Sequence, residues 1–213
     1  MESPFRPDLD VNLIETFRWE PDEGVRRQAA HLDRLAGSAA VLGFAFDRAA
    51  ASARLAGIAG DGPLRCRLSL AQDGALDLTT VPLPPTPPEW RVALSDVRLP
   101  SGDPLLRHKT TRRDLYDAAR AAMPAGMDEV ILCNERGEMC EGAITNLFVT
   151  LDGVRLTPPL ACGLLPGVLR AEMLAQGTAR EAVLTPKDLT HATRIEMGNS
   201  LRGLIPARLL RPG

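Results

Sequence analysis

The chain has almost no lysine, no long apolar run and no paired-cysteine motif, and each absence narrows what the protein can be. No apolar segment approaches the roughly 20 residues that cross a membrane, and the first ten residues lack the apolar core of a signal peptide. The net charge of −2 over 213 residues provides no strongly basic surface for nucleic acid. We therefore expect a cytoplasmic protein that binds neither membranes nor nucleic acid.

The cysteines and histidines show no metal-binding spacing. No CxxC pair occurs, and no cysteine lies beside a histidine at a spacing typical of zinc sites. We therefore expect no metal site. Cys66 and Cys133 lie within apolar, strand-like stretches, which favours reduced, buried thiols.

Lysine is the scarcest charged residue in the chain. Of the 25 basic residues, only Lys109 and Lys187 are lysine, so the others are all arginine. The base composition of the genome would explain this bias, and the two lysines would then be a chance remainder. An arginine side chain stays protonated and cannot form a Schiff base, whereas a lysine ammonium can lose its proton when it is desolvated. Either lysine is therefore a candidate for covalent chemistry.

Apolar periodicity predicts mixed strands and helices in the first part of the chain. A strand precedes two helices, and a hairpin with a turn at residues 72–74 follows them. We expect these strands at 11–19, 64–70 and 75–83, and the helices at 25–44 and 46–60. Five prolines between positions 82 and 88 then exclude a helix interior or a central strand. We interpret residues 85–90 as a linker between subdomains at 1–84 and 91–213.

Strands and helices also mix after the linker. We expect strands at 91–99, 127–134, 143–158 and 179–185, a strand pair within 193–210, and helices at 110–123 and 166–177. The threonines at the start of the segment 110–123 are typical helix caps. Strand and helix do not alternate strictly, so we predict an α+β fold made of two α/β subdomains.

Four features could carry chemistry, although each has an ordinary structural explanation. Lys109 precedes a predicted helix and could be merely solvated. Glu141 stands before an apolar strand and beside Gly142, where a backbone can approach a ligand closely; an acid in that place is commonly solvated, but it could face a cationic ring nitrogen. The start of the 166–177 helix and the turn at Gly198–Ser200 could bind an anion. Together with Arg34 on an upstream helix, these are the parts of a pyridoxal phosphate site.

The chain resembles the class IV, or fold-type IV, pyridoxal phosphate enzymes, a family that includes 4-amino-4-deoxychorismate lyase, branched-chain aminotransferase and D-amino-acid aminotransferase. Six blocks match in order from about Glu15 to Pro206. They are ETFR, HLDRL, HKTTRR, DEVILCNERGEMCEGAITNLFV, LTPPLACGLLPGVLR and EMGNSLRGLIP.

The resemblance implies a role for each matching residue. It implies that Lys109 forms the Schiff base with pyridoxal phosphate and moves protons, and that Glu141 contacts the pyridine nitrogen. It also implies phosphate contacts from one side chain, a helix start and a turn. These are Arg34, Gly167 with Val168, and Asn199 with Ser200. The implied fold is two α/β subdomains with the cofactor between them, in a homodimer that acts on a small-molecule substrate.

Within this family the sequence favours the lyase, which converts 4-amino-4-deoxychorismate to 4-aminobenzoate and pyruvate for folate synthesis. Branched-chain aminotransferases carry threonine where this chain has Leu169, and a glycine-threonine pair in the turn where it has Asn199. Apart from this choice, the chain departs from the branched-chain aminotransferases at a tyrosine that contacts the cofactor ring oxygen, five residues after the lysine. This position is Asp114 here, and the only tyrosine is Tyr116. A class IV aminotransferase and a non-catalytic family member are the alternatives.

Overall fold

The computed structural model describes residues 11–210, which divide into two units. The first unit runs to Pro85 and also includes His108–Arg112, and the second consists of Thr86–Arg107 and the chain from Arg113 onward. The division falls within the proline-rich segment, and a later piece of chain returns to the first unit. Residues 1–10, in which we expect no signal-peptide core, lie outside the described residues.

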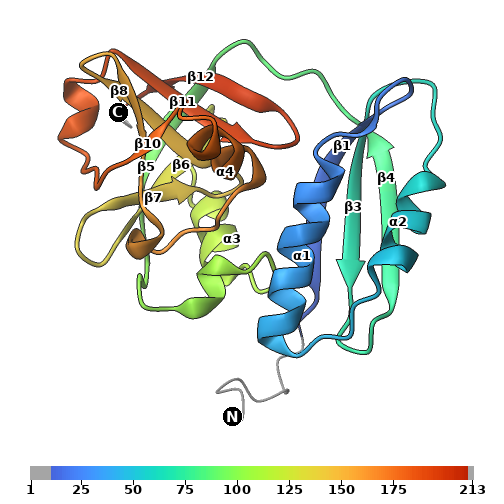
Figure 1. Ribbon diagram of the computed structural model, residues 1–213. Coiled ribbons are helices and arrows are strands. Elements are labelled where there is room, and N and C mark those ends of the chain that lie inside the picture. Colours follow the sequence, from blue (N-terminus) through green and yellow to red (C-terminus); the bar gives the residue numbers. More distant parts are fainter. Residues whose placement is uncertain (1–10, 211–213) are drawn as a thin grey trace. The chain divides into compact units, whose positions relative to one another are not determined.

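The first unit is an antiparallel sheet with two helices (Figure 1). Its strand order is β2-β1-β3-β4. The elements are β1 (Leu13–Glu20), β2 (Gly24–Val25), α1 (Gln28–Leu42), α2 (Arg48–Ala56), β3 (Leu64–Leu70) and β4 (Leu76–Pro82). Each element lies within or close to a segment that the apolar pattern predicted, apart from the two-residue β2.

Strand alternation gives the first sheet one buried face. On β1, Leu13 and Phe17 pair in register with Leu70 and Cys66 of β3, and all four are fully buried. Leucines of α1 and α2 complete this core, because their side chains recur at helical spacing. Glu15 shares the apolar face and is as buried as its neighbours, so its charge must be satisfied inside the unit.

Residues 108–112 join the first unit through backbone hydrogen bonds to the start of β1. The Ile14 N–H donates to the Lys109 carbonyl at 2.8 Å, and the Thr111 N–H donates to the Asn12 carbonyl at 2.9 Å. The Thr111 hydroxyl in turn accepts from the Asn12 N–H. The prediction that these threonines cap a helix is therefore wrong. The helix α3 (Asp114–Ala121) begins two residues after Arg112, because residues 110 and 111 are extended along β1.

The second unit is an eight-stranded mixed sheet in the order β10-β9-β8-β11-β12-β5-β6-β7. An additional pairing of β7 with β8 joins the last strand to an interior one, so six strands form a closed circuit. The strands are β5 (Trp90–Leu99), β6 (Glu129–Asn134), β7 (Met139–Gly142), β8 (Asn146–Leu151), β9 (Val154–Thr157), β10 (Arg180–Glu181), β11 (Arg194–Asn199) and β12 (Gly203–Leu209). The helical elements besides α3 are α4 (Val168–Ala175) and three short 3₁₀ turns, η1 (Pro104–Arg107), η2 (Leu160–Cys162) and η3 (Asp188–Thr190).

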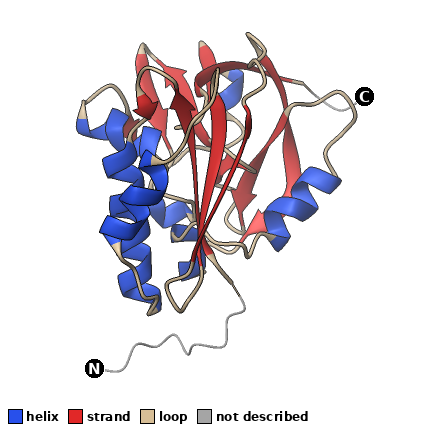
Figure 2. Ribbon diagram, turned by 90° about the vertical axis from the view of Figure 1, so that its right-hand side faces the viewer, coloured by secondary structure: helices blue, strands red, loops and turns tan. Residues whose placement is uncertain are grey.

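Side chains from most strands of this circuit pack into one apolar core. Val92, Ile131, Leu147 and Met197 are completely buried in it. Every residue of β6 is buried, as expected for an apolar strand in the interior of a sheet. Figure 2 shows strands and helices mixed in the α+β arrangement that the sequence predicts.

Two details of the second unit differ from the sequence prediction. The strand predicted at 179–185 is reduced to β10, because the chain leaves β9 and the Leu184 carbonyl instead accepts from the Met139 N–H of β7. Glu141 precedes the apolar strand β8 as predicted, but it also lies within β7, a short strand that the sequence did not predict. All four cysteines are free thiols and buried, which confirms the interpretation of Cys66 and Cys133. No helix within residues 11–210 is long and apolar enough to cross a membrane.

Candidate active site

A buried ion-pair cluster in the first unit contains Arg34. Arg34 donates from Nε to Glu15 Oε1 at 2.8 Å and from a terminal nitrogen to Oε2 at 2.6 Å. His31 Nδ1 lies 2.7 Å from the same Oε2. His31 and Arg34 are three residues apart on α1 and therefore share a face, which packs on the inward side chains of β1. The two-point contact fixes the plane of the Arg34 guanidinium.

The charges of this cluster decide the ionisation of Glu15. Burial alone raises the pKa of this carboxyl, but the Arg34 charge and the hydrogen bonds from His31 and Arg34 outweigh burial and lower the pKa to about 2. Glu15 is therefore ionised at neutral pH and stabilises the neighbouring cation.

Backbone and side-chain contacts connect the Lys109 segment to this cluster. The Lys109 carbonyl accepts from Ile14, the residue immediately before Glu15. His108 Nδ1 lies 3.0 Å from the hydroxyl of Ser38, which is one helical turn after Arg34 on α1. Lys109 thus follows His108, which contacts α1, and the Lys109 carbonyl binds the start of β1. The structure places Lys109 and Arg34, two of the predicted site residues, in the same unit beside the same strand and helix.

In the second unit, Glu141 is a buried carboxylate surrounded by hydrogen-bond donors. It pairs in register with Asn146 where β7 meets β8, and it is only 4% exposed. Its Oε1 accepts from the Tyr116 hydroxyl at 2.7 Å and from the Leu165 N–H at 3.0 Å, and its Oε2 accepts from Asn146 Nδ2 at 3.1 Å. Because a carboxylate accepts hydrogen bonds and a carboxylic acid must donate one, these donors favour the ionised form.

Asn146 also connects Glu141 to the start of α4. Its Nδ2 donates to the Leu165 carbonyl at 3.0 Å as well as to Glu141. A Cβ atom at Gly167 would lie 1.9 Å from Asn146 Oδ1, so only glycine fits at this helix N-cap. The first N–H groups of α4, beginning at Val168, have no acceptor within the helix and carry the positive end of its dipole. Asn146 thus contacts Glu141 and lies beside the start of α4, where Gly167 and Val168 are found.

The turn between β11 and β12 lies against the loop that connects β7 to β8. Asn199 Nδ2 donates to the Ile144 carbonyl at 3.1 Å, and its Oδ1 accepts from the Arg202 N–H at 2.9 Å. Ser200 is buried beside it. A Cβ at the preceding Gly198 would lie 3.2 Å from Leu169 Cδ2 of α4. The predicted residues Asn199 and Ser200 therefore belong to the same cluster of the second unit as Glu141 and Gly167.

Sequence reasoning missed Glu129, the buried acid that shapes this loop. Its carboxylate accepts from the N–H groups of Val130, Ala143 and Ile144 and from the Thr145 hydroxyl, at 3.0–3.1 Å. Burial raises the pKa of Glu129, although these hydrogen bonds oppose the shift. The available signal was an acid at the start of the wholly apolar run VILC, a position where a carboxylate needs internal partners.

The loop after β7 is also tightly packed. A Cβ at Gly142 would lie 2.5 Å from Thr145 Oγ1 and 2.7 Å from Met197 Cε. The sequence predicted that a ligand could approach the backbone closely at Gly142. In the structure, the atoms close to Gly142 belong to the protein itself.

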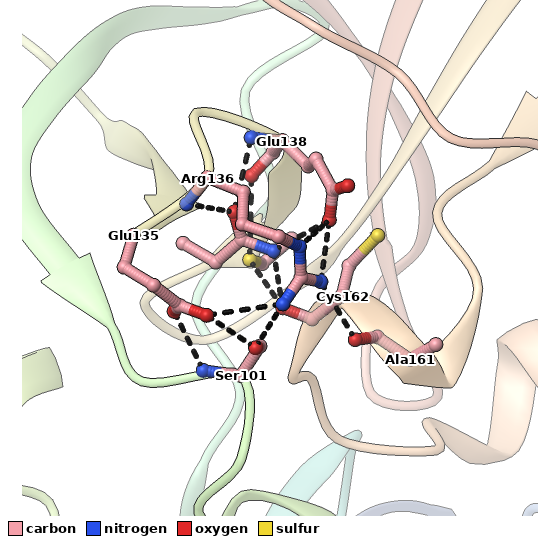
Figure 3. A network of polar contacts seen from close by, with 8 residues as sticks. Ser101, Glu135, Arg136, Glu138, Ala161 and Cys162 are labelled. Atoms are coloured by element: carbon pink, nitrogen blue, oxygen red, sulfur yellow. Dashed lines mark hydrogen bonds and ion pairs between the residues drawn. The ribbon is translucent and has the colours of Figure 1, made fainter.

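A polar network holds the segment that leads to Leu165 (Figure 3). Arg136, on the turn between β6 and β7, donates to Glu138 at 2.6 Å, to the Ala161 carbonyl at 3.1 Å and to the Ser101 hydroxyl. Asn134 donates to the Cys162 carbonyl at 3.0 Å. The β6–β7 hairpin, which carries Glu141, is thus joined to the segment whose N–H contacts Glu141.

The residues of both clusters suit pyridoxal phosphate. In the second unit, a buried carboxylate can accept from a cationic ring nitrogen, and the N–H groups at the start of α4 suit a phosphate. In the first unit, an arginine of fixed orientation suits a phosphate oxygen, and a lysine stands on the adjoining segment.

Comparison with known proteins identifies the family. Residues 12–210 match the model described as "Amino-transferase class IV". A crystal structure from Mesorhizobium loti, titled "Putative amino-acid aminotransferase", is 49% identical with a TM-score of 0.88, over 94% of this chain and 100% of that one. The 4-amino-4-deoxychorismate lyase of Pseudomonas aeruginosa is 26% identical with a TM-score of 0.81, over 93% of this chain and 83% of that one.

Some sequence matches are shorter. The "Probable branched-chain-amino-acid aminotransferase" of Thermotoga maritima is 30% identical over 106 residues, which span 47% of this chain and 38% of that protein. The family match, in contrast, covers nearly the whole chain. The chain belongs to the class IV aminotransferase family, whose aminotransferases and lyases depend on pyridoxal phosphate and act on small molecules.

Proposed function

We propose that the protein is a 4-amino-4-deoxychorismate lyase, which releases 4-aminobenzoate and pyruvate in folate synthesis. The observation that carries this proposal is the environment of Leu169. This residue, which replaces a threonine of the branched-chain aminotransferases, is 6% exposed and packs in a cluster with Phe148 and Met173. An apolar buried side chain here offers no hydroxyl to a phosphate or substrate.

Asn199 supports the same choice. Its side-chain amide spans the turn, because one end donates to Ile144 and the other accepts from Arg202. A glycine-threonine pair would supply no such bridge. A lyase must recognise one substrate, whereas an aminotransferase must recognise an amino donor and a keto acid in turn.

The roles that we propose follow the chemistry of each residue. Bound pyridoxal phosphate stabilises the negative charge left at Cα when a proton is removed. Lys109 would hold the cofactor covalently until the substrate amine replaces it, and its released amine would then take the Cα proton and return a proton later in the reaction. Glu141 accepts from the ring nitrogen and keeps it protonated. Arg34, the Gly167–Val168 backbone and the Asn199–Ser200 turn bind the phosphate. From the resemblance we also propose a cytoplasmic homodimer.

The aminotransferase alternative remains open because the Mesorhizobium loti structure carries that description. One assay separates the two activities: the cofactor-loaded protein is incubated with 4-amino-4-deoxychorismate and, separately, with an amino-acid panel plus a keto acid. The lyase proposal predicts fluorescence of 4-aminobenzoate together with pyruvate release. Transfer of the amino group to the keto acid, without aminobenzoate, would replace the lyase by the aminotransferase.

A further inference from the structure

The single tyrosine of the chain makes a hydrogen bond that the proposed function does not use. Tyr116 lies on α3, and its hydroxyl donates to Glu141 Oε1 over 2.7 Å. The contact joins residues 25 positions apart, so it depends on the tertiary packing of α3.

A neighbouring arginine fixes the position of the phenol. The Arg113 guanidinium lies 5.1 Å from the centre of the Tyr116 ring, in a cation–π contact. Arg113 also donates to the Ala143 carbonyl at 2.7 Å, in the loop that follows Glu141. Arg113, at the start of α3, therefore joins the Tyr116 ring to the loop that follows Glu141.

The hydroxyl remains a donor throughout the physiological pH range. Burial and the adjacent Glu141 charge raise the pKa of Tyr116 well above its ordinary value of about 10. Oε1 of Glu141 thus receives one side-chain donor, Tyr116, and one backbone donor, Leu165. Two donors on one oxygen fix the plane of the carboxylate and favour its charged form.

We propose that Tyr116 is a positioning residue, whose hydroxyl favours the ionised form of Glu141 and orients its carboxylate toward the cationic ring nitrogen of the cofactor. This inference rests on the proposed role of Glu141. It assigns the tyrosine to the acid and not to the cofactor ring oxygen, which the tyrosine of branched-chain aminotransferases contacts. Tyr116 acts through Glu141.

The contact itself can be tested without cofactor. Because the chain contains one tyrosine, the near-ultraviolet tyrosinate absorbance of the apoprotein reports Tyr116 alone. We expect ionisation only well above pH 10 in the wild type, and at a lower pH in Glu141→Gln, since that variant removes the adjacent negative charge. An ordinary titration near pH 10 in the wild type, or identical titrations in both proteins, would overturn the proposal.

Its effect is tested by measuring the dissociation constant of pyridoxal phosphate for Tyr116→Phe, which keeps the ring and removes only the hydroxyl. A hydrogen bond to a charged group corresponds to about 10-fold or more in affinity. We expect a weakening of that size, which grows as the pH falls from neutral because the carboxylate is then protonated more readily.

Thr157→Val is the matched control. Thr157 is fully buried in the same unit, and its hydroxyl donates to the Leu147 carbonyl at 2.8 Å and not to Glu141. We expect wild-type affinity and pH dependence in this control. Equal weakening in both variants would show a general loss of stability and contradict the positioning role. Unchanged binding by Tyr116→Phe would contradict it while the proposed function stands, whereas a wild type that binds no cofactor would overturn both.

Discussion

Two buried carboxylates, one in each unit, are satisfied in opposite ways. In the first unit Glu15 contacts the cation of Arg34 and the imidazole of His31, and its pKa is lowered to about 2. In the second unit Glu129 accepts from three backbone N–H groups and one hydroxyl, and burial raises its pKa. Both are almost completely buried. The full positive charge beside Glu15 therefore outweighs the effect of burial on its pKa. The neutral donors around Glu129 reduce the effect of burial on its pKa but do not reverse it.

The two carboxylates orient different parts of the protein. The Glu15 pair orients a side chain, the guanidinium of Arg34, through charge. The Glu129 bonds orient a backbone loop, residues 142–145, which lies between Glu141 and Asn146. Glu15 contacts a predicted cofactor-binding residue directly, and Glu129 contacts the loop beside another.

The largest effect is expected when the charged cluster is broken. Glu15→Gln leaves Arg34 and His31 without their buried anion, and the loss of one partner of such a pair costs about 3–5 kcal/mol. Urea unfolding measures the change. Glu20→Gln on the same strand is the control, because its partner Arg18 is partly exposed and the loss should stay within about 1 kcal/mol. Equal losses in the two variants would remove the distinction between the clusters.

A decrease in pH should change the contributions of Glu15 and Glu129 to folding stability in opposite directions. The folded pKa of Glu15, about 2, lies below its ordinary 4.5, so its contribution to stability is complete above pH 4.5 and is lost as the pH falls toward 2. The loss amounts to about 3 kcal/mol. Glu129 has a raised pKa, so its contribution declines as the pH rises above 4.5.

Unfolding free energies measured from acid to neutral pH test both signs. Glu15→Gln should lose most of the acid-induced decrease below pH 4.5, and Glu129→Gln should retain it. The assignment fails if the wild-type curve and the Glu15→Gln curve fall in parallel at low pH.

A smaller effect is expected where the backbone approaches Asn146. The Cβ of Gly167→Ala would lie 1.9 Å from Asn146 Oδ1, so the asparagine and its bond to Glu141 must shift. Overpacking of this kind costs about 1–3 kcal/mol, and cofactor affinity should fall with it. Gly37→Ala in α1 is the control, since nothing lies within 4 Å of its Cβ and the substitution should stabilise the helix by up to about 1 kcal/mol. Full cofactor affinity in Gly167→Ala would argue against this helix start as a phosphate site.

The sequence predicted those features that depend on local pattern. Alternation along LRCRLSL and the apolar run of β6 were sufficient to place two strands. The helix cap expected at Thr110 and Thr111 failed because both residues bond β1, about 100 positions earlier in the chain. A local capping pattern contains no information about such a pairing.

In the candidate site, too, local sequence motifs were informative and contacts between distant residues were not predicted. The family motifs predicted roles for Lys109, Glu141 and Arg34, but not the side chains that contact them. Glu15 stands in the ETFR block, yet its contact with Arg34 needs the packing of α1 on β1. The contact between Tyr116 and Glu141 needs the docking of α3 near β7. Supporting partners are set by tertiary register, which the sequence alone does not reveal.

Covalent attachment of pyridoxal phosphate is the most direct test of the central claim, because the chain has only two lysines. Borohydride reduction of the loaded protein, followed by peptide mass analysis, identifies the attachment site. Lys109→Ala should lose the visible absorbance of the bound cofactor, while Lys187→Ala, whose residue is exposed beside η3, should keep it. We predict the reduced cofactor on Lys109. Attachment at Lys187, absorbance retained in both variants, or a wild type that never acquires the absorbance would contradict the account.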